Sequence, residues 1–433
     1  MASIVVIGTG MAGFGASSAL NAEGIRPVVY DKNPYYGGHT ASFKDAQGFV
    51  FDLGPHISFT KDSRMQDLFA GYVEQKYESV QINLNNYWRG IRVTHPVQLH
   101  LNALPKDLTV EIIADFVKEH SVERKIANYE DWLVASYGRK FAELFPMTYT
   151  RKYHLTTASN LTTDWLGPRM YRPSLEELLR GALGPWKPEL HYITNFRYPS
   201  LGGFISYLRD LPKIADIKLE HELVAVDPKQ KTLRFSNGLT SPYDALISSV
   251  ALPDLLPMIV DAPNDIVEAS QQLACSTCVL VNVGVDRADL SQSQMTYFYD
   301  EDICFSRISF PHMLSANNAP PGCGSIQAEV YFADKYRPLT RAPEELIEPV
   351  IADLRRSGTL RENDNILTSH ARVVRHANVI FDLDRTAALA AVHGYLDDVG
   401  IAYCGRYGDW GYMWTDESFL SGERAAQSAL SRC

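Results

Sequence analysis

The segment SIVVIGTGMAGFG at residues 3–15 decides the fold of this chain. Its opening run of isoleucine and valine favours a short buried strand. Gly8, Gly10 and Gly13 follow with the spacing G-x-G-x-x-G, and small and apolar residues then recur at helical intervals. A second apolar strand, RPVVYD, ends in Asp31. This order of elements, a strand, a glycine turn, a helix, a second strand and an acid, predicts a dinucleotide-binding βαβ unit.

Each of these residues has a physical role in holding a dinucleotide. Gly8 permits the tight turn, Gly10 lets the backbone approach a pyrophosphate, and Gly13 lets the helix pack closely on the strand. The N–H groups at the start of the helix face the phosphates, and the helix dipole favours their negative charge. The carboxylate of Asp31 can accept hydrogen bonds from ribose hydroxyls and would repel a 2′-phosphate. The alternative is an ordinary βαβ unit with a glycine-rich turn.

Two further segments bear on which nucleotide is bound. The pair Gly37 and Gly38 follows the acid, and residues 48–60 read GFVFDLGPHISFT. Both segments resemble those of the FAD flavoproteins of the amine oxidase, protoporphyrinogen oxidase and UDP-galactopyranose mutase group. In that group the glycine pair extends the cofactor site, and the second segment reaches the isoalloxazine ring. The resemblance implies FAD, whereas the spacing alone leaves NAD open.

Composition bounds the classes of function. The 433 residues are 45% hydrophobic and 21% charged, which suffices for two to three domains with large cores. The net charge of -10 argues against nucleic acid as a main partner. No apolar run approaches the roughly 18 residues of a membrane span. Because the first strand begins at residue 3, we expect no signal peptide and a cytoplasmic location.

The six cysteines predict neither a disulfide framework nor a metal centre. Cys275 and Cys278 have CxxC spacing, but they lead directly into the apolar strand VLVNVGV. No second CxxC or histidine pair accompanies them, so we expect no metal site.

The remaining pattern divides the chain into three domains. Residues 104–184 carry apolar side chains at three- and four-residue intervals, which predicts helices that interrupt the nucleotide fold. Residues 276–340 are rich in strand formers. We therefore predict an α/β protein with a doubly wound, Rossmann-like FAD-binding domain, an inserted helical domain and an antiparallel-sheet substrate domain. The expected ranges are 1–60, 196–275 and 395–433 for the FAD-binding domain, 104–195 for the helical insertion, and 61–103 and 276–394 for the mixed β/α substrate domain.

Nearly the whole chain is similar to the UDP-galactopyranose mutases, especially the eukaryotic type. GFVFDLGPH resembles a family motif whose histidine lies beside the flavin, which implies this role for His56. WLGPRM and SRISF resemble two segments whose arginines grip the substrate diphosphate from opposite sides. The resemblance thus assigns Arg169 and Arg307 to the diphosphate.

The C-terminal segment GRYGDWGY resembles the last cofactor segment of the family. The resemblance implies that Gly405 and Arg406 lie on the flavin side and that Tyr412 contacts the substrate phosphates. A helix is expected to start near Ser418, with its first N–H groups toward the flavin pyrimidine ring. Val224, in the strands before ISSV, is implied to lie beside the adenine.

The chain departs from the family at the nucleotide end. Asn378 stands where the family has a tyrosine on the diphosphate, within HANV instead of H-G-Y-P. Thr150 and His154 stand where a mobile segment of the family has an asparagine and a tryptophan near the uracil. The flavin end is therefore better matched than the nucleotide end, and uracil, thymine and guanine all stay open as the base.

The resemblance implies a flavoenzyme that acts on a diphosphate-linked sugar, by a pyranose/furanose isomerisation through an adduct at N5 of the reduced flavin. His56, Arg169 and Arg307 are the expected catalytic groups, since cations would stabilise the diphosphate as it leaves. The alternative is an FAD-dependent oxidoreductase of the amine oxidase or protoporphyrinogen oxidase type. Either interpretation implies a small-molecule substrate. The sequence does not identify the reductant or the electron acceptor. The inserted helices could pair subunits, so a homo-oligomer stays open.

Overall fold

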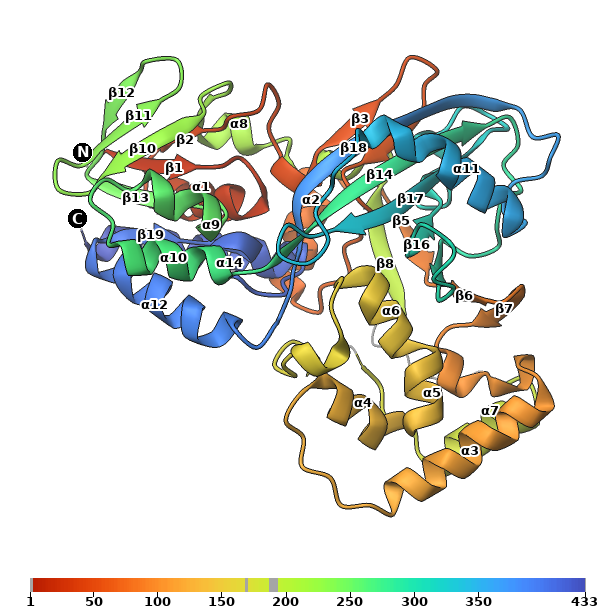
Figure 1. Cartoon of the computed structure of the whole chain (residues 1–433). Coiled ribbons are helices and arrows are strands. Elements are labelled where there is room, and N and C mark those ends of the chain that lie inside the picture. Colours follow the sequence, from red (N-terminus) through yellow and green to blue (C-terminus); the bar gives the residue numbers. More distant parts are fainter. Residues whose placement is uncertain (1–2, 168–169, 187–193, 433) are drawn as a thin grey trace.

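A computed structural model describes residues 3–167, 170–186 and 194–432 (Figure 1). The nucleotide-binding region is built on a five-stranded sheet in the order β19-β13-β1-β2-β9, in which every neighbouring pair is parallel. This sheet confirms the predicted Rossmann-like fold. Its strands are β1 (Ile4–Ile7), β2 (Val28–Tyr30), β9 (Asp216–Lys218), β13 (Ala245–Ser248) and β19 (Ile401–Tyr403).

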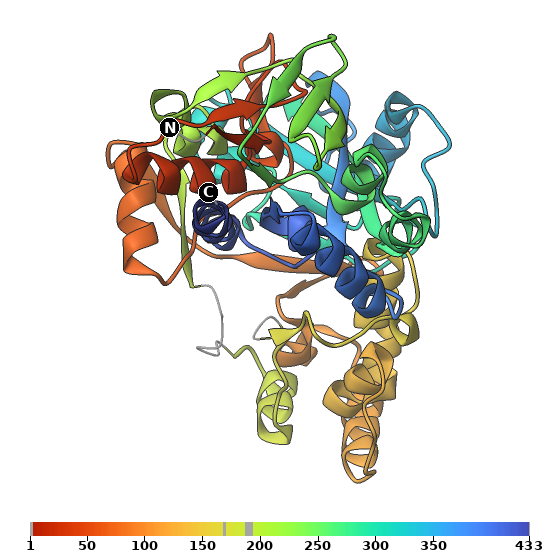
Figure 2. The same ribbon diagram turned by 90° about the vertical axis from the view of Figure 1, so that its left-hand side faces the viewer.

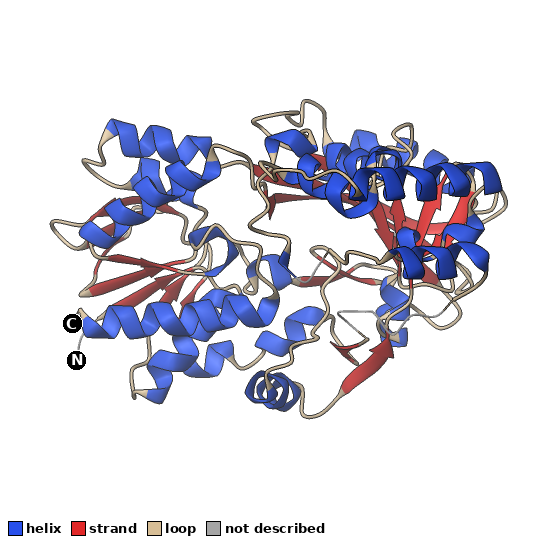
Figure 3. Ribbon diagram, turned by 90° about the horizontal axis from the view of Figure 1, so that it is seen from below, coloured by secondary structure: helices blue, strands red, loops and turns tan. Residues whose placement is uncertain are grey.

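Alternate residues of β1 serve the two faces of this sheet, as the period of two in a strand requires. Ile4 and Val6 join one hydrophobic cluster, and Val5 and Ile7 join another. Helices cover both faces, so the strands lie between two helical layers (Figure 3). The first face carries α1 (Met11–Ala22) and α14 (Thr415–Ser431), and the second carries α10 (Asn264–Gln272), α12 (Arg385–Asp398) and the antiparallel strands β10 (Leu223–Asp227), β11 (Thr232–Phe235) and β12 (Thr240–Pro242).

Two helices pack on this sheet although the sequence assigned them to the substrate domain. Helix α2 (Ser63–Tyr72) buries Phe69 in the cluster that contains α1. Helix α12 buries Leu396 in the cluster on the opposite face. A parallel sheet needs cover on both faces. The expected domain boundaries at residues 61 and 395 therefore do not coincide with the boundaries of packing.

Helices α1 and α14 cross at very close range, side by side in Figure 2. A Cβ atom on Gly15 would overlap the carbonyl group of Phe419, and one on Gly422 would overlap the carbonyl oxygen of Ala12. The two backbones touch because neither helix carries a side chain at the crossing. This contact holds the N-terminal ends of both helices on the same side of the molecule.

The part of the chain expected to form the substrate domain contains a seven-stranded sheet, called the substrate sheet below, in the order β18-β14-β17-β16-β15-β6-β7. All pairs are antiparallel except β6 and β15, which run parallel, so the sheet is mixed. Helix α11 packs on one face of it through its apolar side. The bounds are β6 (Leu84–Trp88), β7 (Ile91–Thr94), β14 (Cys275–Val285), β15 (Met295–Phe298), β16 (Arg307–Ser309), β17 (Gly324–Phe332), β18 (Ile366–Val379) and α11 (Ile347–Arg356).

The helical insertion lies at the far end of the molecule from the parallel sheet (Figure 1). Its helices share one hydrophobic cluster, which also takes in Trp88 and Val93 of the seven-stranded sheet. Its helices are α3 (Lys106–His120), α4 (Tyr129–Tyr137), α5 (Arg139–Leu144), α6 (Pro146–Tyr153) and α7 (Leu175–Leu183).

Helix α6 is fastened to the loop that follows β15. Arg151 makes a two-pronged ion pair with Glu301 at 2.8 and 3.0 Å. Lys152 donates from Nζ to the carbonyl oxygens of Phe298 and Asp300 at 3.1 and 2.7 Å. The segment that resembles a mobile part of the mutases therefore forms a helix in this structure, and ion pairs and hydrogen bonds attach this helix to the loop after β15.

The helix crossing predicts opposite effects of two glycine substitutions. Gly422→Ala should lower the free energy of unfolding by about 1–3 kcal/mol, because the new methyl group has no room. Gly394→Ala in α12 is the matched control, because a Cβ atom there meets no atom within 4 Å. It should raise stability by about 0.4–1 kcal/mol. Urea denaturation followed by circular dichroism measures both, and equal effects at the two positions would contradict the close crossing.

Candidate functional site

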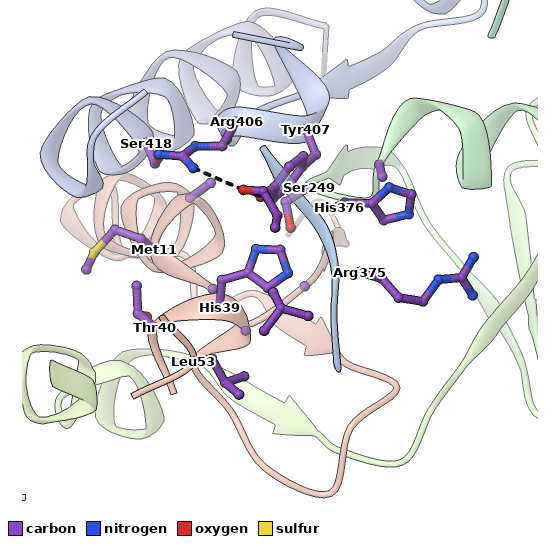
Figure 4. Close-up of a pocket in the computed structure, with 18 of the residues that line it drawn as sticks. Met11, His39, Thr40, Leu53, Ser249, Arg375, His376, Arg406, Tyr407 and Ser418 are labelled. Carbon is purple, nitrogen blue, oxygen red and sulfur yellow. Dashed lines mark hydrogen bonds between the residues drawn. The ribbon is translucent and has the colours of Figure 1, made fainter. Parts of the chain in front are cut away.

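One cavity of about 560 Å³ runs from the glycine turn after β1 to the substrate sheet (Figure 4). The β1–α1 turn, the glycine pair, the segment after β4 (Val50–Asp52), the end of β18 and the start of α14 all contribute to its wall. The expected site residues among its lining are Gly8, Gly10, Asp31, Gly37, Gly38, His56, Arg307, Asn378, Gly405, Arg406, Tyr412 and Ser418.

The three glycines of the turn are required for different reasons. Gly8 has φ +104, and a Cβ atom on Gly13 would overlap the carbonyl oxygen of Gly8. A Cβ atom on Gly10 would lie 3.8 Å from the nearest atom, the carbonyl oxygen of Gly37, which is an ordinary contact. The packing of the chain therefore explains Gly8 and Gly13 but not Gly10. Gly10 lines the cavity, where a residue without a side chain would let a ligand phosphate approach the backbone.

Asp31 organises the glycine turn from the end of β2. Its Oδ2 accepts hydrogen bonds from the backbone N–H and the hydroxyl of Thr9 at 2.9 and 2.5 Å. Its Oδ1 accepts from the backbone and side-chain nitrogens of Asn33 at 2.9 and 3.0 Å. The carboxylate has about four acceptor positions. A ribose hydroxyl would therefore compete with Asn33, whose side chain is the partner that can move.

The glycine pair and α14 complete the phosphate end of the cavity. A Cβ atom on Gly38 would lie 3.2 Å from the Cα atom of Gly10, so the pair sits directly against the turn. Ser418 lies in the first turn of α14 and lines the cavity. The N-termini of α1 and α14 thus face one space, and both favour negative charge there.

His56 reaches the cavity from the segment after β4. Its Nδ1 lies 2.9 Å from the carbonyl oxygen of Gly54. A carbonyl only accepts, so Nδ1 carries the proton and Nε2 presents a lone pair. Burial lowers the pKa of His56 to about 4, and the charges of Arg406 and Arg307 act in the same direction. His56 is therefore a neutral imidazole at neutral pH.

Asp52, which sequence reasoning did not assign to the site, holds this region together. Its carboxylate accepts from Ser42 Oγ at 2.6 Å, from Tyr198 Oη at 2.8 Å and from the backbone N–H of Phe204 at 3.1 Å. Its carbonyl oxygen accepts from Gln327 Nε2 on β17 at 2.8 Å. Asp52 therefore ties residues 48–60, the segment expected to reach the flavin and called the flavin segment below, to β8 (Asn195–Pro199) and to the substrate sheet.

A bulge in β18 brings Asn378 and Arg406 together. The register with β14 shifts between Ser276 and Cys278, and His376 within the bulge has φ +55. Bulges commonly redirect side chains next to binding sites. Arg406 donates to the carbonyl oxygens of Met413 and Ala377 and lies 3.5 Å from Asn378 Oδ1. Its hydrogen-bond partners in the described chain are thus neutral oxygens.

Arg307 lies at the other end of the cavity in a different electrostatic setting. Its Nε and Nη2 each bind one carboxylate oxygen of Glu329, both at 2.8 Å. Only 1% of the Glu329 side chain is exposed. Tyr331 also donates to this carboxylate. Glu329 and Tyr331 were not among the residues expected at the site.

Two histidines beside the flavin segment were also not expected there. His39 follows the glycine pair, packs edge-on against Tyr407 at 5.1 Å between ring centroids, and has its pKa lowered to about 3 by burial. His376 Nε2 lies 2.9 Å from Asp254 Oδ2. Both histidines line the cavity, His39 from the segment after the glycine pair and His376 from the bulge of β18 (Figure 4). The signal for His39 was present in the sequence, directly after Gly38.

Three expected positions lie away from the cavity wall. Val224 is 46% exposed, and its neighbours Glu222 and Leu223 line the cavity instead. Thr150 donates its hydroxyl hydrogen to the carbonyl oxygen of Pro146 within α6 at 2.7 Å. His154 is buried against Tyr153 and Trp165. Gly13 acts through packing, as described above, and Arg169 lies outside the described residues.

The described ranges contain neither a metal-binding cluster nor a membrane-spanning helix. No group of three or more histidine, cysteine, aspartate or glutamate side chains there is arranged to hold a metal ion. No helix in the same ranges is long and apolar enough to cross a membrane. Cys275 and Cys278 lie in β14, and burial raises the pKa of both thiols.

Comparison with known proteins resolves the type of nucleotide-binding protein. The family of NAD(P)-binding Rossmann-like domains matches residues 6–72. The crystal structure of reduced UDP-galactopyranose mutase matches with a TM-score of 0.91 and 25% identity, over 100% of this chain and 94% of that chain. This chain is thus similar, over its full length, to UDP-galactopyranose mutase, and it has the fold of an FAD-binding flavoprotein. The cavity offers the glycine turn, the glycine pair and the two helix N-termini that suit the pyrophosphate of FAD.

Other flavoproteins share the fold at lower similarity. A provisionally assigned protoporphyrinogen oxidase from Exiguobacterium sp. 255-15 matches with a TM-score of 0.75 and 15% identity, over 99% of this chain and 98% of that chain. A double mutant of putrescine oxidase matches with a TM-score of 0.64 and 15% identity, over 99% of both chains. These two likenesses concern the fold alone.

Sequence relatives match only a short segment. The 15-cis-phytoene desaturase of Narcissus pseudonarcissus is 33% identical over 67 residues, which are 16% of this chain and 12% of the desaturase. The 1-hydroxycarotenoid 3,4-desaturase of Flavobacterium sp. (strain P99-3) is 33% identical over 85 residues, or 20% of this chain and 16% of that enzyme. The matched part thus spans less than a fifth of these relatives.

The glycine turn predicts a separation of cofactor binding from folding. Gly10→Ala should leave the stability of the FAD-free protein unchanged, because the methyl group makes only ordinary contacts. It should weaken FAD binding at least about tenfold, because the methyl group occupies the phosphate cradle. Gly71→Ala in α2, where a Cβ atom meets nothing within 4 Å, is the control and should keep full affinity. Fluorescence titration of the FAD-free protein with FAD measures both. Equal affinities would place the phosphates elsewhere.

Asp52 predicts an unusual pH dependence of stability. Burial raises the pKa of this carboxyl from 3.8 to about 6, although hydrogen bonds from Ser42, Phe204 and Tyr198 oppose the shift. Protonation therefore favours the folded state, and its contribution is present below pH 3.8 and is lost as the pH rises through 6. As the pH rises from 4 to 7, the free energy of unfolding of the Asp52→Asn variant should increase by on the order of 3 kcal/mol relative to that of the wild type. Urea denaturation at several pH values tests this, and a constant difference would refute it.

Proposed function

We propose that this chain is an FAD-dependent enzyme that rearranges the ring of a diphosphate-linked sugar, in the manner of a UDP-galactopyranose mutase-like isomerase. The carrying observation is the likeness to that mutase over the full chain, at a TM-score of 0.91. The oxidases named above match at 0.75 and 0.64. The inserted helices and the substrate sheet therefore follow the mutase as well as the nucleotide-binding sheet does.

The residues of the flavin end suit a reduced cofactor. When bound and reduced, FAD supplies the nucleophilic ring nitrogen for attack on the anomeric carbon. Arg406 is a guanidinium held only by neutral oxygens in the described chain, so its charge is available to stabilise negative charge beside it. His56 keeps its proton on Nδ1 and can accept a hydrogen bond at Nε2.

The roles of the substrate-binding residues remain part of this proposal. Arg169, Arg307 and Tyr412 are assigned to the sugar diphosphate by resemblance. Asn378 offers a shorter polar group than a tyrosine and lies beside Arg406. The base is not assigned, because Thr150 and His154 do not line the cavity.

An oxidoreductase of the amine oxidase type is the second candidate. Tyr153, Tyr331 and Tyr412 line the substrate end, and aromatic walls of this kind also suit oxidation of a C–N or C–H bond. The sequence relatives are desaturases, and two structural neighbours are oxidases. Such an enzyme consumes an electron acceptor in step with its substrate, whereas an isomerase does not.

The deciding experiment is an anaerobic titration of the FAD-loaded protein. The flavin is photoreduced, and UDP-, dTDP- and GDP-linked sugars are added in turn while the absorption spectrum is recorded. Binding and turnover of at least one of them without net flavin oxidation supports the isomerase. A flavin spectrum unaffected by every nucleotide sugar, together with substrate-dependent oxygen consumption for an amine, would favour the oxidoreductase.

A further inference from the structure

A short loop near the end of the chain carries the main partner of Arg406. This loop, residues 410–413, lies in the connection from α13 (Gly405–Gly408) to α14. Arg406 donates from both Nε and Nη2 to the carbonyl oxygen of Met413, and its guanidinium carbon lies 5.5 Å from the centre of the Tyr412 ring. The direction in which Arg406 points therefore depends on the path of this loop.

The loop begins with a residue in an unfavourable conformation. Trp410 has φ +48, a left-handed backbone conformation that bulky side chains rarely adopt. Its side chain is fully buried, and its indole N–H has no hydrogen-bond partner in the described chain. Both features cost free energy, so they persist only where surrounding contacts compensate for them.

Arg385 supplies one such contact from outside the cavity. It is the first residue of α12, and its guanidinium carbon lies 4.2 Å from the centre of the Phe381 ring. It donates from Nε and Nη2 to the carbonyl oxygen of Trp410, and it does not line the cavity. The helix dipole of α12 opposes a cation at this end, so the helix itself gains nothing from the charge of Arg385. The contact with the loop gives this arginine a role.

The peptide group between Trp410 and Gly411 is consequently held on both sides. Its carbonyl oxygen accepts from Arg385, and its N–H donates to the carbonyl oxygen of Arg406 at 3.0 Å. A rotation of this peptide plane would relieve the left-handed conformation of Trp410, but it would break these hydrogen bonds. Arg385 therefore opposes a movement that would release the backbone of Arg406.

We propose that Arg385 is a positioning residue, which fixes Arg406 in the cavity by holding the carbonyl group of Trp410. Arg406 is expected on the flavin side, where its charge stabilises the negative charge that the flavin ring gains on reduction. Arg385 acts on that charge only through the loop. The proposal concerns the cofactor alone, so it holds for an isomerase and for an oxidoreductase.

The reduction potential of the bound flavin tests this role. FAD-loaded protein is photoreduced anaerobically with a reference dye, which gives the potential of the two-electron couple. Arg406→Met should destabilise the reduced flavin about tenfold or more relative to the oxidised flavin, a shift of about 30 mV to more negative potential. Arg385→Met should give a destabilisation of at least about threefold, because Arg406 is no longer held in one place. Arg385→Gln is the milder variant, since its amide keeps one N–H donor, and its shift should be smaller in the same direction.

A double-mutant cycle distinguishes positioning from an independent effect of Arg385. If Arg385 acts through Arg406, adding Arg385→Met to Arg406→Met should change the equilibrium between oxidised and reduced flavin by less than about 1.5-fold. Arg385→Lys keeps the positive charge but replaces the fork by a point charge. It should therefore still destabilise the reduced flavin at least about twofold.

The matched control is Arg26→Met. The guanidinium of Arg26 also donates to backbone carbonyl oxygens, those of Pro212, Lys213 and Ala215, and it does not line the cavity. Its removal should leave the flavin potential unchanged. Urea denaturation followed by circular dichroism confirms that each variant is folded before its potential is measured.

Several results would overturn the positioning role. These are a wild-type potential in Arg385→Met and Arg385→Gln, a wild-type potential in Arg385→Lys, or an equal shift from Arg385→Met with and without Arg406. A wild-type potential in Arg406→Met would do the same, since there would be no charge to position. Wild-type protein that takes up no FAD would overturn both this role and the proposed function. Protein that takes up FAD but acts on no nucleotide sugar would refute the isomerase alone.

Discussion

The crossing of α1 and α14 is the contact on which the binding site depends. Two helices that approach until their backbones touch can do so only where both lack side chains, and Gly15 and Gly422 meet that condition. The first helix leaves the glycine turn, and the second begins beside the flavin segment. Their shared crossing fixes the distance between these two ends of the cofactor site. Asp52 performs the corresponding task across the cavity, where it joins the flavin segment to the substrate sheet.

Charge is distributed unevenly along the cavity that results. The glycine turn and the two helix N-termini favour anions at the phosphate end. Arg406 keeps an uncompensated charge in the middle, among neutral oxygens. Beyond it, Arg307 is neutralised by Glu329. The histidines His39 and His56 are kept uncharged by burial, so they add hydrogen-bonding capacity without adding charge.

Sequence reasoning succeeded where structure is determined by neighbours along the chain. The βαβ unit, the glycine pair and the helix near Ser418 follow from local patterns of turns and apolar residues, and all three are present. It failed where partners come from distant segments. Glu329 meets Arg307 only because β16 and β17 pair in one register. The hydroxyl of Thr150 does not reach the cavity, because it donates a hydrogen bond to the carbonyl oxygen of Pro146 in the preceding turn of α6. The domain limits were misjudged at α2 and α12 because the need to cover a parallel sheet is a property of the assembled fold.

The strand order of the parallel sheet has a consequence for folding during synthesis. Strand β1 is synthesised well before β19 and α14, which complete the sheet and the cavity wall and come from residues beyond 400. The cavity is therefore incomplete until those residues have left the ribosome. Until then the earlier apolar strands lack part of their cover, and transiently exposed apolar surface of this kind favours aggregation. Flavin capture is consequently a late maturation step, one that follows translation instead of guiding it.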